Sequence, residues 1–238
     1  FSYVSPLAYI QTNIIGTYNI LESCNVNKIK NLIVTSTSEV YGSSKYEPMD
    51  EKHPTFSQSP YAATKKSADE LALSFFNSYD LPVKIIRPFN TYGPRQSPRA
   101  IIPNIAYQLL NKKIKKVKIG NLSPKRDYTY VGDLCEAFYK IHNSKKFGEI
   151  FNTGTNENIT ILELYNKIAK LLKIKKPLNI QRERKRKKKS EVNSLKCDNK
   201  KIYLHLKWKP KTKFNTGLKK TIKWIKNNQS IYKDIYNI

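Results

Sequence analysis

The sequence has 238 residues, of which 39% are hydrophobic, and its 16 Tyr and 9 Phe argue against intrinsic disorder, which is poor in aromatic residues. No stretch approaches the ~18 consecutive apolar residues of a membrane span, and the three scattered cysteines exclude a disulfide scaffold or a cysteine-based zinc site. Lys and Arg total 44 against 18 Asp and Glu, a net charge of +26.

Apolar periodicity then predicts alternating helices and strands along the chain. We expect a first helix from Pro6 to Asn25 with Ser5 as its N-cap, and a polar loop between residues 36 and 60. The other helices are predicted at 61–79, about 99–111, about 131–143, about 160–173 and in two short terminal segments, and the strands at 31–36, 83–87, 116–119 and 149–152. This alternation predicts an α/β fold with a parallel sheet covered on both faces.

Polar side chains follow three of the predicted strands at the point where each strand ends. They lie in the segments Thr35-Ser-Thr-Ser-Glu39, Arg87-Pro-Phe-Asn90 and Asn152-Thr-Gly154. Active sites of parallel sheets lie beyond the carboxyl ends of the strands. The three segments together therefore predict one site.

Tyr61 and Lys65 lie four residues apart at the start of a predicted helix, so they share one face. A lysine ammonium beside a tyrosine stabilises the phenolate and lowers the pKa of the phenol, which can then act as a base. With 16 Tyr in the chain, a chance pair on a solvated helix face is the alternative. The hydroxyl-bearing loop upstream favours catalysis, because Thr37 could bind a substrate oxygen while Tyr61 removes its proton.

Glu39 lies two residues after Thr37 and is a candidate for a second general base. Once an alcohol carbon has been oxidised to a ketone, the hydrogen on the neighbouring carbon becomes acidic enough for a carboxylate to remove. By itself Glu39 would be interpreted as an exposed loop residue. Beside Thr37, Ser38 and Tyr61, the catalytic interpretation is preferred.

Five motifs in order resemble those of the extended short-chain dehydrogenase/reductase family, which contains the NAD-dependent nucleotide-sugar epimerases and dehydratases. They are Thr37-Ser-Glu-Val-Tyr-Gly42, Tyr61-Ala-Ala-Thr-Lys65, Arg87-Pro-Phe-Asn-Thr-Tyr-Gly-Pro-Arg95, Arg126-Asp-Tyr-Thr-Tyr-Val-Gly-Asp133 and Asn152-Thr-Gly154. The resemblance extends from Thr12 to Ile225.

The resemblance implies a Rossmann-like, doubly wound NAD-binding domain formed by residues 1–91 and 129–154. Residues 92–128 and 155–238 would form a smaller α+β domain that binds the nucleotide sugar. The implied catalytic residues are Thr37, Ser38, Glu39, Tyr61 and Lys65, and the residues implied to bind NAD are Asn13, Ser36, Tyr61 and Lys65. No metal is implied.

The Thr37-Ser38-Glu39 triplet resembles the 4,6-dehydratases, whereas epimerases usually lack the acid. Glucuronate decarboxylases share the triplet, so the triplet alone does not distinguish a dehydratase from a decarboxylase. Segments 93–103, 182–192 and 197–199 most resemble the dehydratases of the legionaminic acid pathway, which act on a nucleoside-diphosphate N-acetylglucosamine. The implied product is a 4-keto-6-deoxy sugar for glycan synthesis. In related dehydratases an Asp often occupies the position of Ser38 as the acid, so the proton donor stays open.

Five residues are candidates for holding the substrate: Asn90, Arg95, Arg99, Arg126 and Arg184. Guanidinium groups match phosphate oxygens bidentately. The excess of positive charge lies after residue 110, since the first 110 residues hold 10 basic and 8 acidic side chains. Polyanion binding by a non-catalytic remnant is the alternative from another class, but solubilising lysines explain most of this charge. The basic run 182–189 lacks interleaved aromatics, so we expect no nucleic-acid partner.

The family's Gly-rich turn, which cradles the pyrophosphate of NAD, has no counterpart among the 8 glycines of this sequence. We therefore expect the chain to bind NAD poorly and to be unstable or inactive alone, as a fragment, part of a split gene or a degenerate remnant. No signal peptide is evident at Phe1 and the thiols fit a reducing compartment, which predicts a cytoplasmic protein without a membrane partner. Helices 7–23 and 61–79 resemble a pair that forms a dimer interface in this family, so we expect a homodimer.

Overall fold

The computed structural model describes residues 2–181 and 187–231. At its centre lies a three-stranded parallel sheet in the order β1-β2-β7. Its strands are β1 (Leu32–Thr35), β2 (Val83–Pro88) and β7 (Ile150–Thr153). Successive side chains of a strand face opposite sides of the sheet, so Val83 and Ile85 enter one core cluster and Ile86 enters another.

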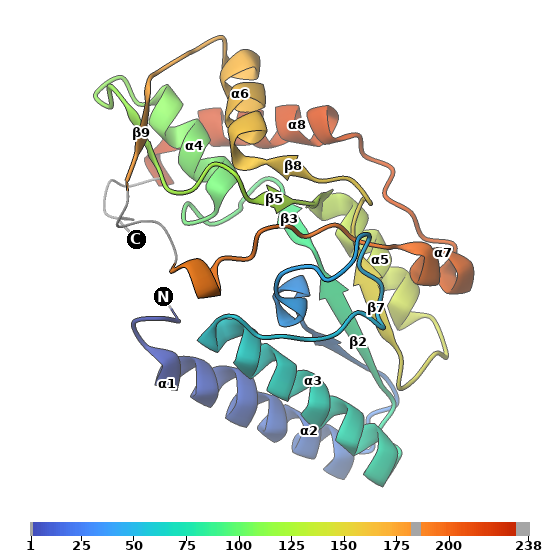
Figure 1. The fold of residues 1–238 in the computed structure, drawn as a ribbon. Coiled ribbons are helices and arrows are strands. Elements are labelled where there is room, and N and C mark those ends of the chain that lie inside the picture. Colours follow the sequence, from blue (N-terminus) through green and yellow to red (C-terminus); the bar gives the residue numbers. More distant parts are fainter. Residues whose placement is uncertain (1, 182–186, 232–238) are drawn as a thin grey trace.

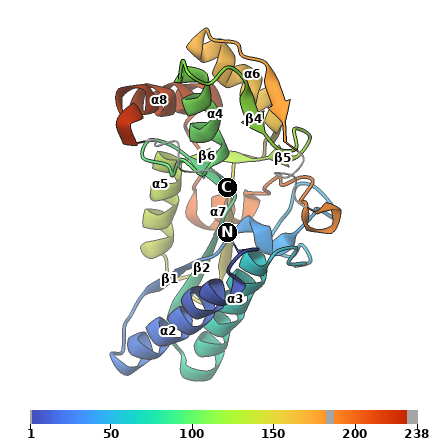
Figure 2. The same cartoon turned by 90° about the vertical axis from the view of Figure 1, so that its left-hand side faces the viewer.

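Helices cover both faces of this sheet (Figures 1 and 2). On one face α2 (Gly16–Val26) and α3 (Pro60–Tyr79) pack their apolar side chains, such as Leu21, against β2. On the other face lies α5 (Val131–His142), and α7 (Lys200–Leu206) packs beside β7. The predicted doubly wound α/β fold is confirmed in this half of the molecule.

A separate core forms in the upper part of Figure 1, above the parallel sheet. Three helices build it: α4 (Ile101–Leu110), α6 (Ile161–Leu172) and α8 (Phe214–Asn227). The short strands around it are β3 (Asn90–Tyr92), β4 (Val117–Ile119), β5 (Lys125–Arg126), β6 (Tyr128–Tyr130), β8 (Ile159–Thr160) and β9 (Leu178–Ile180). They form the pairs β3-β6, β4-β9 and β5-β8.

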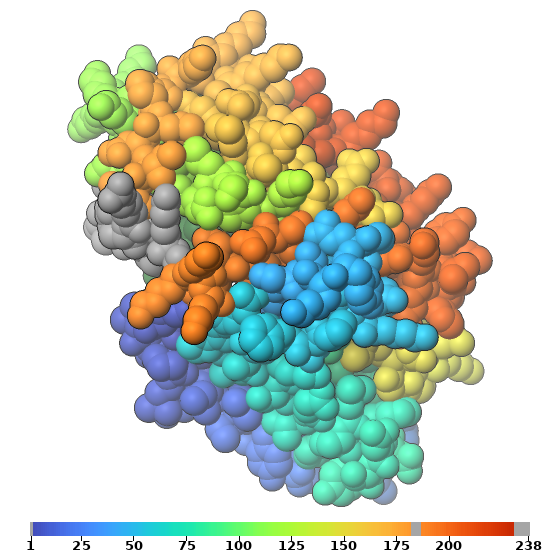
Figure 3. Space-filling view, in the orientation of Figure 1, coloured from blue at the N-terminus to red at the C-terminus, as the bar shows by residue number. Residues whose placement is uncertain are grey.

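The chain after residue 187 crosses one face of the molecule between these two cores. Figure 3 shows it packed against the segment formed by residues 40–59. A bridge joins Met49 to Cys197, and Gln58 Nε2 donates to the Lys189 carbonyl at 2.8 Å. Short 3-10 helices are η2 (Ser38–Tyr41), η4 (Lys188–Ser190) and η5 (Gln229–Ile231). The crossing segment thereby closes over the η2 region.

The predicted first helix is divided into α1 (Pro6–Tyr9), the π-helix η1 (Ile10–Ile15) and α2. Ser5 occupies the N-cap position, but its side chain makes no cap hydrogen bond, since its ψ of 68° leaves the extended region that caps adopt. The long helices and the three sheet strands lie close to their predicted positions. No helix among the described residues is long and apolar enough to cross a bilayer.

Candidate active site

Two elements at the carboxyl end of β1 carry the predicted catalytic residues. The chain turns into η2, where the Thr37 hydroxyl accepts a hydrogen bond from the Glu39 amide at 3.2 Å. The first turn of α3 carries Tyr61, and Ser59 caps this helix by accepting from the Ala62 amide at 3.1 Å. Capping fixes where α3 begins, and it thereby fixes the position of Tyr61 at the sheet edge.

Thr37 and the Glu39 carboxylate both lie close enough to the Tyr61 hydroxyl to shift its pKa. Burial raises the pKa of Tyr61, hydrogen bonding by Thr37 opposes this shift, and the charge of Glu39 adds to it. The prediction that Lys65 lowers the pKa of Tyr61 is therefore wrong for this structure, because desolvation and nearby carboxylates dominate. The predicted proximity of Thr37, Glu39 and Tyr61 is found.

Lys65 lies one turn after Tyr61 on α3 and is half-buried, and burial lowers the pKa of its ammonium while Asp69 opposes this. Asn13 supports the same turn from the π-helix η1. Its Nδ2 donates to Thr64 Oγ1 at 3.0 Å, and that hydroxyl donates to the Tyr61 carbonyl at 2.9 Å. π-Helical turns are often found at functional sites. Asn13 thus contacts the turn between Tyr61 and Lys65.

A buried polar network lies beneath these residues, and the sequence analysis did not predict it. Asp69 Oδ2 accepts from Ser36 Oγ at 2.8 Å and from Arg87 Nε at 2.9 Å. Arg87 Nη1 donates to the Tyr41 hydroxyl at 3.1 Å, which donates to Asn152 Oδ1 at 2.8 Å. The network links the three motif segments that follow the strands. The feature of the sequence that could have predicted this network is Asp69, an acidic residue two turns after Tyr61 on the same helix.

A cavity of about 330 Å³ adjoins this site, and we call it the Glu39 cavity. Its lining includes Glu39, Asn90, Arg126 and the first residues of α4, Ile101 and Ile102. The Asn90 Oδ1 atom is buried and makes no hydrogen bond to the described residues. The first amides of a helix lack intrahelical acceptors and favour anions. The cavity therefore offers an amide, a guanidinium and a helix N-terminus to a ligand.

The other predicted substrate residues do not join this cavity. Arg95 and Arg99 are exposed on the segment before α4 and line neither the Glu39 cavity nor the larger one described below. Arg95 has a left-handed backbone with φ of 65°, which belongs to a turn. Arg184 lies outside the described residues. Tyr128, inside the Arg126-Asp-Tyr motif, lines the cavity but was not predicted from the sequence.

The residues at the end of β1 fit the nicotinamide end of NAD. Lys65 presents a half-buried ammonium that makes no hydrogen bond to the described residues, and Tyr61 and Ser36 lie nearby on α3 and after β1. Ammonium and hydroxyl donors suit the hydroxyl groups of a ribose. Among residues 2–181 and 187–231, no group of three or more His, Cys, Asp or Glu side chains could hold a metal ion.

Sequence comparison matches the chain to one family model and to several related proteins. The family model described as GDP-mannose 4,6 dehydratase matches residues 1–221. Human dTDP-D-glucose 4,6-dehydratase is 30% identical over 98% of this chain and 67% of its own length. The bovine protein of the same name is 32% identical over 95% of this chain and 64% of its own length. The chain thus spans about two thirds of these relatives.

Structure comparison finds the same fold in solved proteins. The dTDP-glucose 4,6-dehydratase of Bacillus anthracis, in complex with NAD, has a TM-score of 0.85 and 32% identity, covering 93% of this chain and 70% of that chain. With the family model spanning both cores and all five motifs, the predicted resemblance is confirmed, and the chain belongs to the GDP-mannose 4,6 dehydratase family of extended short-chain dehydrogenases/reductases.

Proposed function

We propose that this chain takes part in the NAD-dependent 4,6-dehydration of a nucleoside-diphosphate sugar. The observation that carries the proposal is Glu39, whose carboxylate lies near the Tyr61 hydroxyl and lines the same cavity as Asn90 and Arg126. Dehydration needs two bases that act on adjacent carbons of one ring. The influence of the Glu39 carboxylate on the Tyr61 hydroxyl supports action of the two groups on a single pyranose.

In the proposed reaction Tyr61, hydrogen-bonded to Thr37, takes the proton of the sugar O4 hydroxyl. When bound, NAD would supply a reversible hydride acceptor beside C4 and C6, so the reaction would have no net redox change. Glu39 removes the proton from C5 and returns it there when hydride reaches C6, and the C6 hydroxyl leaves as water with a proton that the buried Ser38 helps to deliver. Lys65 holds the ribose beside Tyr61. The product is a 4-keto-6-deoxy sugar.

The Glu39 cavity supports a diphosphate as the recognised group. Arg126 is 8% exposed and supplies the cationic side chain of the lining, whose acidic side chains are Glu39 and Glu191. The amides at the start of α4 add positive potential to that of Arg126. Asn90 would accept a hydrogen bond from a sugar hydroxyl through its unpaired Oδ1. For the sugar we propose N-acetylglucosamine, supported by the resemblance of segments 93–103 and 197–199 to the legionaminic acid pathway dehydratases.

We further propose the division into an NAD-binding part (1–91 and 129–154) and a substrate-binding part (92–128 and 155–238). Two separate core clusters support it, one around the parallel sheet and one among α4, α6 and α8. The Glu39 cavity takes Glu39 and Asn90 from the first part and Arg126 from the second. Ligand sites commonly lie between domains.

A hydrogen-exchange experiment tests Glu39 without requiring NAD. The chain is incubated in D₂O with a UDP-linked 4-keto-6-deoxy N-acetylhexosamine, and deuterium at C5 is followed by proton NMR. We expect exchange with the wild type, at least about a hundredfold slower exchange with Glu39→Gln, and no change with the control Glu47→Gln, an exposed acid on the same loop.

Because the sequence lacks the Gly-rich turn that cradles the pyrophosphate of NAD, the chain is joined to such a segment from a relative. Mass spectrometry after incubation with UDP-N-acetylglucosamine and NAD then distinguishes the reactions. Loss of one water supports the dehydratase, an isomer of unchanged mass supports a 4-epimerase, and CO₂ release from UDP-glucuronate supports a decarboxylase. The epimerase has specific support in UDP-glucuronic acid 4-epimerase of Bacillus cereus, at 28% identity and a TM-score of 0.85, covering 94% of this chain and 69% of that chain. Wild-type exchange equal to that of Glu39→Gln would refute the proposed role of Glu39.

A further inference from the structure

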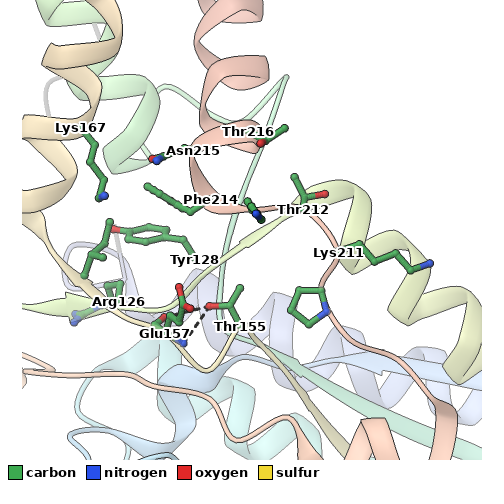
Figure 4. Close-up of a pocket in the computed structure, with 13 residues that line it drawn as sticks. Arg126, Tyr128, Thr155, Glu157, Lys167, Lys211, Thr212, Phe214, Asn215 and Thr216 are labelled. Carbon is green, nitrogen blue, oxygen red and sulfur yellow. Dashed lines mark hydrogen bonds between the residues drawn. The ribbon is translucent and has the colours of Figure 1, made fainter.

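A second cavity, of about 660 Å³, shares only Arg126 and Tyr128 with the Glu39 cavity. We call it the Lys167 cavity. The rest of its lining comes from the loop after β7, from α6 and from the segment 210–216 that leads into α8 (Figure 4). Its volume lies within the range of small-ligand sites. The proposed dehydration uses none of the residues that line this cavity alone.

Positive charge dominates the lining of the Lys167 cavity. Arg126, Lys167, Lys211 and Lys213 face one carboxylate, that of Glu157. Lys211 is already paired with Glu136 at 2.8 Å. The Lys213 ammonium has no hydrogen-bond or ion-pair partner among the described residues. Lys213 therefore offers an anion a cation that no described side chain pairs.

Two further donors lie against the same space. α8 spans 14 residues, and its N-cap Lys213 makes no side-chain cap bond, so the first amides of the helix keep their positive field. Tyr128 is only 5% exposed, and its hydroxyl has no hydrogen-bond partner among the described residues. In Figure 4 the Tyr128 ring lies among the lining side chains with its hydroxyl end toward the side of Lys167. A buried hydroxyl without a partner is costly and indicates a ligand acceptor.

Buried carboxylates hold the walls of the cavity in place. Asp127 accepts from the amides of Thr155 and Asn156 at 2.8 and 2.9 Å. Asp133 accepts from the amide and hydroxyl of Thr212 at 3.0 and 3.1 Å. These bonds fix both loops before a ligand arrives, which reduces the entropy cost of binding. The cavity is a preorganised site and not a gap between mobile loops.

We propose that the Lys167 cavity binds a nucleoside phosphate at a site separate from the Glu39 cavity. Lys167, Lys213 and the first amides of α8 contact the phosphates. Phe214 and Tyr128 supply aromatic surface for the base or ribose. The inference does not depend on the proposed dehydration, because it rests on different side chains.

Isothermal titration calorimetry with dTDP and with inorganic pyrophosphate tests the proposal on the full chain. The variant Lys167→Gln/Lys213→Gln removes two cations of the cavity. The matched control Lys170→Gln/Lys219→Gln removes two exposed lysines from α6 and α8 that line neither cavity. Because the Glu39 cavity is itself proposed to hold a diphosphate, both lysine pairs are also introduced into Asn90→Ala. For the binding that remains in that variant, we expect the first pair to weaken both probes at least about tenfold and the control to change it less than about twofold.

Three outcomes overturn the inference. Wild-type protein that binds neither probe has no such site, and equal weakening by the two lysine pairs means attraction by net charge alone. An affinity for dTDP no higher than that for pyrophosphate rejects the nucleoside. The variant Asn90→Ala separates the two sites: loss of all binding in this variant alone places the ligand in the Glu39 cavity, which would reject this inference and leave the proposed function standing.

Discussion

Asp69 joins the two segments that carry the candidate catalytic residues. One of its oxygens accepts hydrogen bonds from Ser36, just before Thr37, and from Arg87, which also reaches Tyr41 at the end of η2. The loop with Thr37, Ser38 and Glu39 is therefore connected to the Asp69 carboxylate on both sides, before the loop through Ser36 and after it through Arg87 and Tyr41. Since Asp69 stands on α3, these ties fix the loop relative to Tyr61 and Lys65.

Removing the charge of Asp69 should destabilise the protein strongly. Its ion pair with Arg87 is 2.9 Å long, with side-chain exposures of 0% and 3%, so Asp69→Asn leaves a buried guanidinium without a counter-charge. We expect a loss of about 3–5 kcal/mol in the free energy of unfolding, measured by urea denaturation. The control Glu70→Gln breaks the neighbouring surface pair with Lys66 and should cost under about 1 kcal/mol. Equal losses in the two variants would contradict the argument.

Asp127 should make stability depend on pH in an unusual direction. Burial raises the pKa of Asp127 to about 6, although four hydrogen bonds from Thr155, Asn156 and Cys197 oppose the shift. Because the folded state then holds its proton more tightly than the unfolded chain, the contribution of Asp127 is full below about pH 4 and falls as the pH rises to about 6. The fall is on the order of 3 kcal/mol.

Urea unfolding at several pH values between 4 and 7 checks this dependence by comparing wild type with Asp127→Asn. The difference in unfolding free energy between the two proteins should shift against the wild type as the pH rises across this window. A difference that stays constant, or that moves in favour of the wild type, would show that the carboxylate is ionised throughout.

The site illustrates what a sequence can and cannot provide at the scale of residues. Thr37, Glu39 and Tyr61 were predictable because each sits at a fixed offset from a strand or helix end. The direction of the pKa shift of Tyr61 was not, since it depends on burial and on carboxylates that approach from other elements. Arg95 and Arg99 were predicted from chemistry alone, and their exposed backbone segment keeps them outside the cavity.

Individual elements begin and end where particular side chains satisfy the free backbone groups. α6 has a capping box: Thr160 Oγ1 accepts from the Glu163 amide at 3.1 Å, and Glu163 accepts from the Thr160 amide at 2.7 Å. Long helices and buried strands leave a periodic pattern that predicts them. Strands of two or three residues such as β5 and β8 are too short to leave one, and the π-helix η1 keeps the apolar pattern of an α-helix.

Loss of the cap on α6 should lower the stability of the protein measurably. Thr160→Ala removes the acceptor for the Glu163 amide, and we expect a decrease of about 1 kcal/mol in the free energy of unfolding. Thermal denaturation followed by circular dichroism checks it. Asn166→Ala, an exposed change in the same helix, serves as control and should leave stability unchanged or slightly higher. A decrease no larger than that of the control would show that the cap is dispensable.

At the scale of the whole molecule, the surface of the N-terminal helices is apolar. Leu7, Ile15 and Ile20 expose 61%, 52% and 57% of their surface, although they lie in helices that pack against α3. Contiguous exposed apolar patches commonly mark protein interaction sites. The expectation of a homodimer through helices 7–23 and 61–79 thus remains our proposal, with a second copy of this chain as the partner.

Light scattering coupled to gel filtration measures the mass of this assembly. We expect the wild type to elute at twice the 27.6 kDa mass of the chain and the variant Leu7→Glu/Ile15→Glu to elute as a monomer. The control Tyr139→Glu/Leu204→Glu changes two apolar residues elsewhere that are more exposed, at 70% and 65%, and should stay dimeric. A monomeric wild type would reject the proposal.

Lys84 is the second residue of β2 and is fully buried, and its ammonium donates to the carbonyls of Ile141, His142 and Ser144 at the end of α5. In a chain so rich in amines, this one is shielded from electrophiles in the medium. Brief treatment with an acylating reagent should label the exposed lysines first and Lys84 only after the molecule opens. Its labelling rate would then report, within one tryptic peptide, how often α5 separates from the sheet.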